Sequence, residues 1–185
     1  PATGREWGLK TNWWYDGKRD VIASTEAALN FLIYLHQKFD NDWLLAIAAY
    51  NAGPGRVNRA IRENKAKGLA TDFWSLRLPK ETSAYVPKLL VLSELIKNPS
   101  SFGVTLPSIA NRPYFTKIET PGQVDLMQAA DLAGMTPEAI YELNPGFSQW
   151  ATDPSGPHYL LLPTGIADRF LIQLSSLEEV ELVQW

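Results

Sequence analysis

This chain lacks cysteine entirely, so disulfide bonds and thiolate metal sites are excluded. Its two histidines, His36 and His158, lie far apart in the sequence, which gives a histidine metal site little support. No apolar run reaches the ~18 residues that a membrane-spanning helix needs. Runs of Lys or Arg are also missing and the net charge is −3, so nucleic acid is not an expected partner. We therefore expect no metal and no other cofactor.

The residues that are present indicate a folded protein. Apolar residues make up 45% of the 185 positions, enough for the core of one large domain or of two small ones. Aromatic residues make up 11%, enough to supply both a core and a cleft that stacks on sugars. The opening residues Pro1 to Gly4 show neither the basic start nor the apolar stretch of a signal peptide. The sequence is therefore expected to be a piece of a longer protein that begins inside a domain.

Helical periodicity runs through the first half of the chain. Apolar residues at 3.6-residue spacing and their punctuation predict four helices, over residues 20–38, 42–52, 54–68 and 79–97. The second is apolar almost all round, which indicates a buried helix. Pro87 lies inside the fourth and is expected to kink it. Residues 11–19 are polar and aromatic and are predicted to form a loop.

The pattern changes after Pro99. The residues predict a strand over 114–119, helices over 123–133 and 136–144, and a strand over 158–163. A helix and a short strand are predicted in residues 165–185. The fold class is therefore mainly α, with a small βααβ unit. The predicted domains are residues 1–98, a linker over 99–111, the βααβ unit over 112–165 and a tail over 166–185.

Tyr50 and Asn51 end the second predicted helix, just before the Gly53-Pro54-Gly55 stop. A helix end at this position can aim a phenol and an amide into a cleft, and the glycines let another chain or a sugar approach closely. The alternative is structural, with a half-buried Tyr50 and an Asn51 that caps the last turn. The pattern alone favours the structural role.

Glu81 and Tyr85 lie four residues apart near the start of the fourth helix, so both lie on one helical face. A structural role is again available, because a glutamate near a helix N-terminus complements the helix dipole and Tyr85 can pack. Taken alone, this pair also favours the structural role.

Together, these motifs resemble those of the Slt-type, lysozyme-like lytic transglycosylases, which cut the glycan strands of bacterial peptidoglycan. The resemblance covers residues 1–98 and rests on Pro1-Ala2-Thr3-Gly4, Trp14 to Ala28, Ala48 to Gly53, and Glu81 to Val86. It implies a partial lysozyme-like domain in which the substrate-binding residues are Ala49, Tyr50, Asn51, Glu81 and Tyr85, with Tyr50 assisting catalysis. It also implies a periplasmic location, with outer-membrane attachment only through an N-terminal lipid anchor that is missing from this chain.

Residues 112–165 resemble a LysM domain, the βααβ module that binds peptidoglycan and chitin. The resemblance rests on Ala129 to Gly134, Tyr141 to Pro145 and Leu160 to Pro163. Two features depart from the LysM pattern: Gly122-Gln123-Val124-Asp125-Leu126 replaces Gly-Asp-Thr-Leu, and residues 147–157 form a long insert. We therefore expect a structural or weakly glycan-binding unit that is docked on the first domain.

Members of the resembled family use one glutamate as acid and then as base. The C6 hydroxyl of N-acetylmuramic acid attacks its own anomeric carbon, which gives a 1,6-anhydro product without water. That glutamate precedes the Pro-Ala-Thr-Gly segment, so we expect it to be absent and this chain alone to be inactive. Glu6 and Glu26 are expected to face solvent, where a carboxyl lacks the raised pKa of a general acid.

Two other functions remain open: a non-catalytic fragment that binds peptidoglycan, and a muramidase that uses water on the same fold. Trp13, Trp14 and Trp43 are expected to be mainly structural, with sugar stacking as the less favoured role. The third predicted helix carries a basic face that is expected to be solvated. Contact of this face with acidic peptide stems of the glycan is the alternative. The basic residues are Arg56, Arg59, Arg62 and Lys65.

Overall fold

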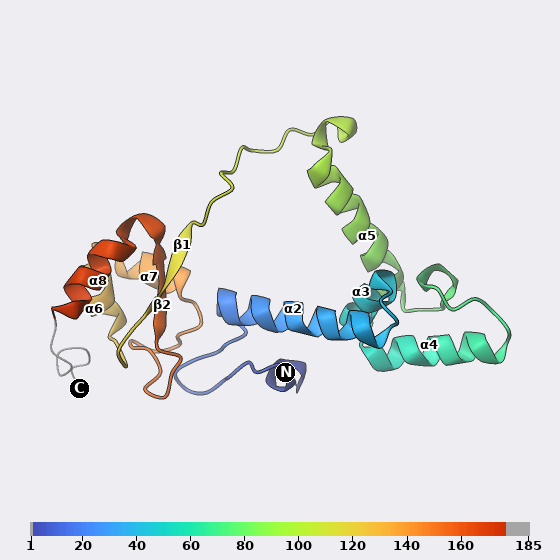
Figure 1. Cartoon of the computed structure of the whole chain (residues 1–185), viewed down its shortest axis with the longest axis horizontal. Coiled ribbons are helices and arrows are strands. Elements are labelled where there is room, and N and C mark those ends of the chain that lie inside the picture. The colour runs from blue at the N-terminus through green and yellow to red at the C-terminus, as the bar shows by residue number, and fades with distance from the viewer. Residues whose placement is uncertain (1, 177–185) are drawn as a thin grey trace. The chain divides into compact units, whose positions relative to one another are not determined.

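The computed structural model describes residues 2–176 (Figure 1). The chain divides into two compact units. One contains residues 28–109, and the other combines residues 1–27 with residues 110–185. The domain limits drawn from the sequence remain a prediction, and each unit is described by itself below.

The unit of residues 28–109 is helical. Its elements are most of α2 (Val21–Lys38), together with α3 (Trp43–Ala52), α4 (Pro54–Ala66), α5 (Lys80–Lys97) and two 3-10 turns at Phe73–Ser75 and Pro99–Phe102. These four helices confirm the four that were predicted. Asp42 starts α3, because its carboxylate accepts the backbone N–H groups of Leu44 at 2.8 Å and Leu45 at 3.1 Å.

The core of this unit lies around α3, as the apolar composition of that helix predicted. Ala46, Ala48 and Ala49 are fully buried. These small side chains let neighbouring helices approach closely, and α3 contacts both α4 and α5. The buried core around them contains Leu35, Phe39, Leu45, Val57, Ala60, Phe73, Leu76 and Val86.

The second unit contains the predicted βααβ arrangement. Its elements are β1 (Phe115–Glu119), α6 (Leu126–Ala133), α7 (Pro137–Leu143) and β2 (Tyr159–Pro163). The two strands pair antiparallel, with Phe115 opposite Pro163 and Glu119 opposite Tyr159. Gly134 ends α6 with a φ of 64°, in the left-handed region that favours glycine. The antiparallel pairing is as predicted from the sequence.

The start of α6 was predicted too early. The helix begins at Leu126 and not at Gln123, because Asp125 is its N-cap and accepts the N–H groups of Met127 and Gln128. The two preceding residues bind elsewhere. Gln123 donates to the carbonyl oxygen of Thr152 at 2.7 Å, and the Val124 N–H donates to the Thr152 hydroxyl at 2.9 Å. Bonds to a distant loop thus replace the first helical turn.

The tail contains a 3-10 turn (Thr164–Ile166) and α8 (Ala167–Ser175), which supplies the buried residues Phe170 and Leu174. This helix was predicted from the sequence. The short strand predicted for the end of the chain lies outside the described residues.

Residues 1–27 add α1 (Ala2–Glu6), a loop and the start of α2 to the βααβ unit. Tyr15 is buried in the core of that unit, where its ring tilts against Phe147 at 5.4 Å. The Asp16 N–H donates to the carbonyl oxygen of Gly146 at 2.8 Å. A Cβ on Gly146 would lie 2.9 Å from the Tyr15 ring, so this close approach requires glycine. The docking expected from the sequence is thus present for residues 1–27.

Candidate functional site

The end of α3 carries the first motif. Gly53 has a φ of 88°, and its N–H donates to the carbonyl oxygen of Ala49 at 2.8 Å. The chain then reverses and α4 starts at Pro54. Tyr50 and Asn51 therefore lie in the last turn of α3, at the position predicted from the sequence.

The side chain of Asn51 joins this helix end to the start of α5. Its Oδ1 accepts the hydroxyl of Thr82 at 2.7 Å, and its Nδ2 lies 3.4 Å from Oε1 of Glu81 as a longer hydrogen bond. Thr82 is 1% exposed, so this amide satisfies a buried hydroxyl. Asn51 does not cap its own helix, which was the structural alternative. The structure thus brings the two motifs together through Asn51 and Glu81.

Tyr50 and Tyr85 remain partly open to solvent. Tyr50 is 38% exposed, and its ring tilts against Phe31 at 5.7 Å. Tyr85 is 36% exposed and follows Glu81 by one helical turn. Ala49 is fully buried and its side chain packs in the core. Among the described residues no hydrogen bond joins either tyrosine to the Asn51–Glu81 pair, so both hydroxyls are available to a ligand.

A general acid needs a carboxyl with a raised pKa. Every glutamate in residues 2–176 is exposed, which confirms the expectation for Glu6 and Glu26. The pKa of the buried Asp153 carboxylate is shifted in the opposite direction. Burial alone would raise its pKa, but hydrogen bonds from Lys10 and Asn12 lower it to about 2. Asp153 is therefore ionised at neutral pH and cannot donate a proton there.

The candidate sugar-stacking tryptophans lie in three different settings. Trp13 is 74% exposed. Trp14 stacks on Trp150 at 5.0 Å, as part of the docking of residues 1–27. Trp43 is half exposed and stacks on His36 at 4.0 Å. Trp14 therefore has the structural role that was favoured, and Trp13 and Trp43 keep open faces.

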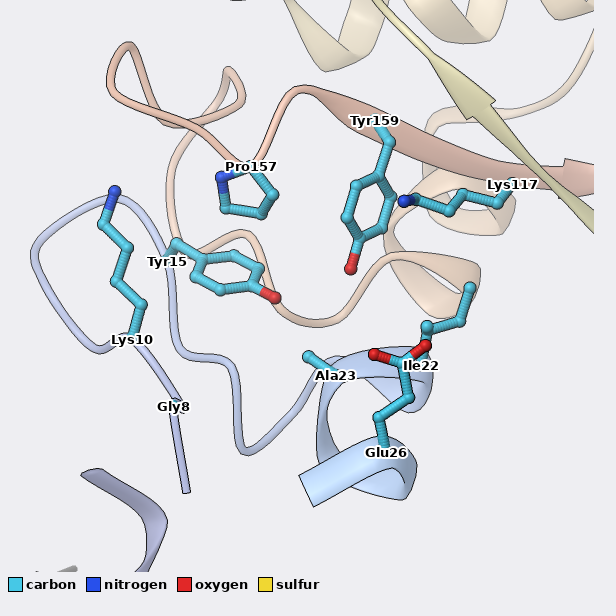
Figure 2. Close-up of a pocket in the computed structure, with 9 residues that line it drawn as sticks. All are labelled: Gly8, Lys10, Tyr15, Ile22, Ala23, Glu26, Lys117, Pro157 and Tyr159. Carbon is cyan, nitrogen blue, oxygen red and sulfur yellow. The ribbon is translucent and has the colours of Figure 1, made fainter. Parts of the chain in front are cut away.

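A pocket that the sequence did not predict lies in the other unit (Figure 2). Its volume is about 270 Å³, and residues from both ends of the chain line it. The hydroxyls of Tyr15 and Tyr159 point into it, and Tyr159 donates to the buried carboxylate of Asp20 at 2.8 Å. Burial raises the pKa of both phenols, so both stay protonated at neutral pH. No local pattern links such distant residues, which is why sequence reasoning missed this pocket.

The two lysines at this pocket already have partners. Lys117 pairs with Glu119 at 2.7 Å, and its ammonium lies 4.4 Å from the centre of the Tyr159 ring. Lys10 pairs with Asp153 at 2.8 Å. The Lys117–Glu119 pair lies within the βααβ unit, and the Lys10–Asp153 pair joins that unit to residues 1–27. The pocket is therefore lined by groups that hold this unit together.

Within residues 2–176, no three or more side chains of His, Cys, Asp or Glu are grouped so that they could hold a metal ion. Among the same residues, no helix is both long enough and apolar enough to cross a membrane.

Comparison with known protein families gives two matches. Residues 1–73 match the transglycosylase SLT domain, and residues 114–179 match the LysM-like domain of the lytic transglycosylase MltD. The second match covers the βααβ unit and α8. The two matched ranges meet in the unit that combines residues 1–27 with residues 110–185.

The chain is also similar to individual proteins. It is 45% identical over 184 residues to membrane-bound lytic murein transglycosylase D of Escherichia coli strain K12, and equally to that of strain CFT073. It is 42% identical over 115 residues to a putative tributyltin chloride resistance protein of Alteromonas sp. strain M-1, covering 61% of this chain and 53% of that protein. The matches to the E. coli proteins cover the whole chain and 40% of each relative's length.

Proposed function

We propose that this chain belongs to the SLT-type lytic transglycosylases, whose SLT domain its residues 1–73 match, and that it forms the substrate-holding part of an enzyme that cleaves peptidoglycan. The bond is the β-1,4 link between N-acetylmuramic acid and N-acetylglucosamine. Cleavage proceeds without water, and the product carries a 1,6-anhydro ring. The name of the E. coli relatives, a membrane-bound murein transglycosylase, supports a periplasmic and membrane-associated location.

The observation that carries this proposal is the junction between Asn51 and the first turn of α5. It fixes the end of α3 against Glu81 and Thr82 and leaves the phenols of Tyr50 and Tyr85 open. A glycan strand offers hydroxyl and acetamido groups, which phenols and carboxylates bind by hydrogen bonds. We assign substrate binding to Ala49, Tyr50, Asn51, Glu81 and Tyr85, with Ala49 acting through its backbone because its side chain is buried.

Tyr50 is assigned an additional role in the reaction. As the glycosidic bond breaks, charge develops on the leaving oxygen and on the catalytic carboxyl. A phenol donor aimed at that charge stabilises the transition state more than the ground state. The contact of its ring with Phe31 and its 38% exposure support this role for Tyr50.

The general acid is not assigned to any residue described here. All described glutamates are exposed, and Glu81 lies 3.4 Å from Nδ2 of Asn51, where we assign it to substrate binding. We propose that these 185 residues alone bind glycan without cleaving it. The absence of a buried glutamate among the described residues supports this proposal.

The βααβ unit is assigned a structural role. Residues 146–153, in its long loop, contact residues 10–16 through Asp16 to Gly146, Ser148 to Trp14 and Lys10 to Asp153. A loop engaged in this way is less open to a glycan. We propose that the unit stabilises the start of α2 and binds peptidoglycan weakly.

The test compares two proteins on purified sacculi. The first is this chain, and the second joins residue 1 to the preceding part of the E. coli transglycosylase domain. Mass spectrometry should find anhydro-muropeptides from the second protein and none from the first. Products one water heavier would identify a muramidase instead. Release of anhydro products by the first protein would show that the acid lies within this chain.

A further inference from the structure

A pocket of about 210 Å³ lies within the unit of residues 28–109, at the start of α4 and α5. Arg56 and Arg59 reach it from α4, and Arg77 reaches it from the segment before α5. Leu78 and Pro79 give it an apolar wall, and Glu63 lies on its lining. The sequence favoured a solvated basic face on α4, with contact to acidic peptide stems as the alternative. It did not add Arg77 to this face, because Arg77 is far from it along the chain.

The three guanidinium groups have no anionic partner among the residues that the structure describes. All three residues are exposed, and none forms an ion pair within residues 2–176. Glu63 also lacks an ion pair in that range, although Arg59 precedes it by one helical turn. Three unpaired cations around one small pocket produce a positive potential that favours a carboxylate ligand.

The N-terminus of α4 adds to this potential. Its N-cap, Gly53, provides no side chain that caps the helix. The N-terminus of a helix carries partial positive charge, so a cation in the first turn is unfavourable. Arg56 nevertheless occupies the first turn of α4, where no acidic residue balances it. A bound anion would relieve this repulsion.

We propose that this pocket binds the carboxylates of the peptide stems that branch from the glycan strand. The inference rests on the proposed function, because it takes its ligand from that substrate. A guanidinium group binds a carboxylate through two parallel hydrogen bonds, and the planar arginine side chain is suited to that geometry. Glu63 provides an acceptor for an amino group on the same stem.

The position of the pocket fits a branch of the substrate. Arg56 follows the Gly53 turn that ends the Asn51 helix, and Pro79 directly precedes the helix that carries Glu81. The arginine pocket and the Asn51–Glu81 contact thus lie where the same two segments meet. A stem that branches from a sugar held at Asn51 would therefore start beside the segments that carry Arg56 and Arg77.

The first experiment titrates this chain with a free stem tetrapeptide, L-alanyl-D-glutamyl-diaminopimelyl-D-alanine, and follows its amide signals by NMR. Shifts are expected around Arg56 and Arg77. The same peptide with amidated carboxyl groups should produce none. Equal shifts from both peptides, or none at about 10 mM free peptide, would overturn the proposal.

The second experiment replaces the three arginines together, as Arg56→Gln, Arg59→Gln and Arg77→Gln. An exposed ion pair contributes up to about fivefold in affinity, so the triple variant is expected to bind the peptide about tenfold more weakly. Arg62→Gln is the matched control, because Arg62 lies on the same helix and does not line the pocket. Circular dichroism checks that each variant is folded. A triple variant that is folded and binds like the wild type would overturn the proposal.

Failure of this proposal can be told apart from failure of the proposed function. Peptide binding is measured without glycan, and formation of anhydro products is measured on sacculi. Loss of the products with intact peptide binding would count against the transglycosylase and not against the pocket. Anhydro products without peptide binding would count against the pocket and not against the transglycosylase.

Discussion

The hydroxyl of Tyr159 donates a 2.8 Å hydrogen bond to Oδ2 of Asp20, which lies 139 residues away in the sequence. The other oxygen of the same carboxylate accepts the N–H of Ala23 at 2.8 Å and caps the start of α2. Asp20 is 5% exposed, and both of its oxygens are therefore satisfied. One buried carboxylate thus connects β2 to the first turn of α2.

Tyr159→Phe is expected to lower the free energy of unfolding by about 1–3 kcal/mol, because it removes the donor to a buried carboxylate. Urea denaturation followed by circular dichroism measures this loss. Tyr114→Phe is the control, since Tyr114 is 75% exposed and its change should stay within ~0.5 kcal/mol. Equal stability of the two variants would show that the bond to Asp20 contributes nothing net.

Tyr50→Phe is expected to lower the rate of anhydro-muropeptide formation about 10²-fold in the joined protein described above. The phenol would no longer donate to developing charge, whereas the ring still packs on Phe31. The melting temperature should change little, because Tyr50 is 38% exposed. A rate equal to that of the unsubstituted protein would identify Tyr50 as a packing residue.

Asn51→Ala is expected to cost about 1–3 kcal/mol of stability, because it leaves the buried Thr82 hydroxyl without its acceptor. Adding Thr82→Val removes that hydroxyl, so the double variant should be more stable than the sum of the two single losses predicts. Thermal unfolding of the three variants provides the double-mutant cycle. Ser83→Ala, at the exposed neighbour, is the control. Strict additivity would contradict the contact between Asn51 and Thr82.

The lowered pKa of Asp153 predicts a loss of stability in acid. Its pKa is lowered from 3.8 to about 2 in the folded chain, so the unfolded chain binds more protons between these values. The stabilisation is complete above pH ~4 and disappears as the pH falls through ~2, and a shift of this size corresponds to about 2 kcal/mol. Denaturation of the wild type and Asp153→Asn across this range measures it. A stability difference that stays constant with pH would contradict the assignment.

Local rules predicted most of the helices. Asp42 and Gly53 are strong signals for a helix start and a helix end, and α3 begins and ends beside them. The start of α6 was placed too early because Thr152, far along the chain, binds the backbone of Val124. Periodicity carries no information about such a partner.

The sequence likewise predicted only part of the candidate site. The positions of Tyr50, Asn51 and Glu81 on their helix ends followed from the sequence, but the bond from Thr82 to Asn51 did not. Thr82 carries no motif of its own, and its role depends on the packing of α3 against α5. The arginine pocket was missed for a related reason, since Arg77 belongs to a loop whose position only the fold defines.

The burial of Tyr15 against Phe147 also sets the order in which the chain can complete its structure during synthesis. Residues 28–109 form their own core and are free to fold as soon as they have been made. The first 27 residues leave the ribosome earlier but must wait for β1, the long loop and β2 before Tyr15 finds its neighbours. Contacts between such distant segments form slowly, because a long loop must close first. Residues 1–27 are thus synthesised before residues 28–109, yet they reach their final packing only after residues 110–163 have been made.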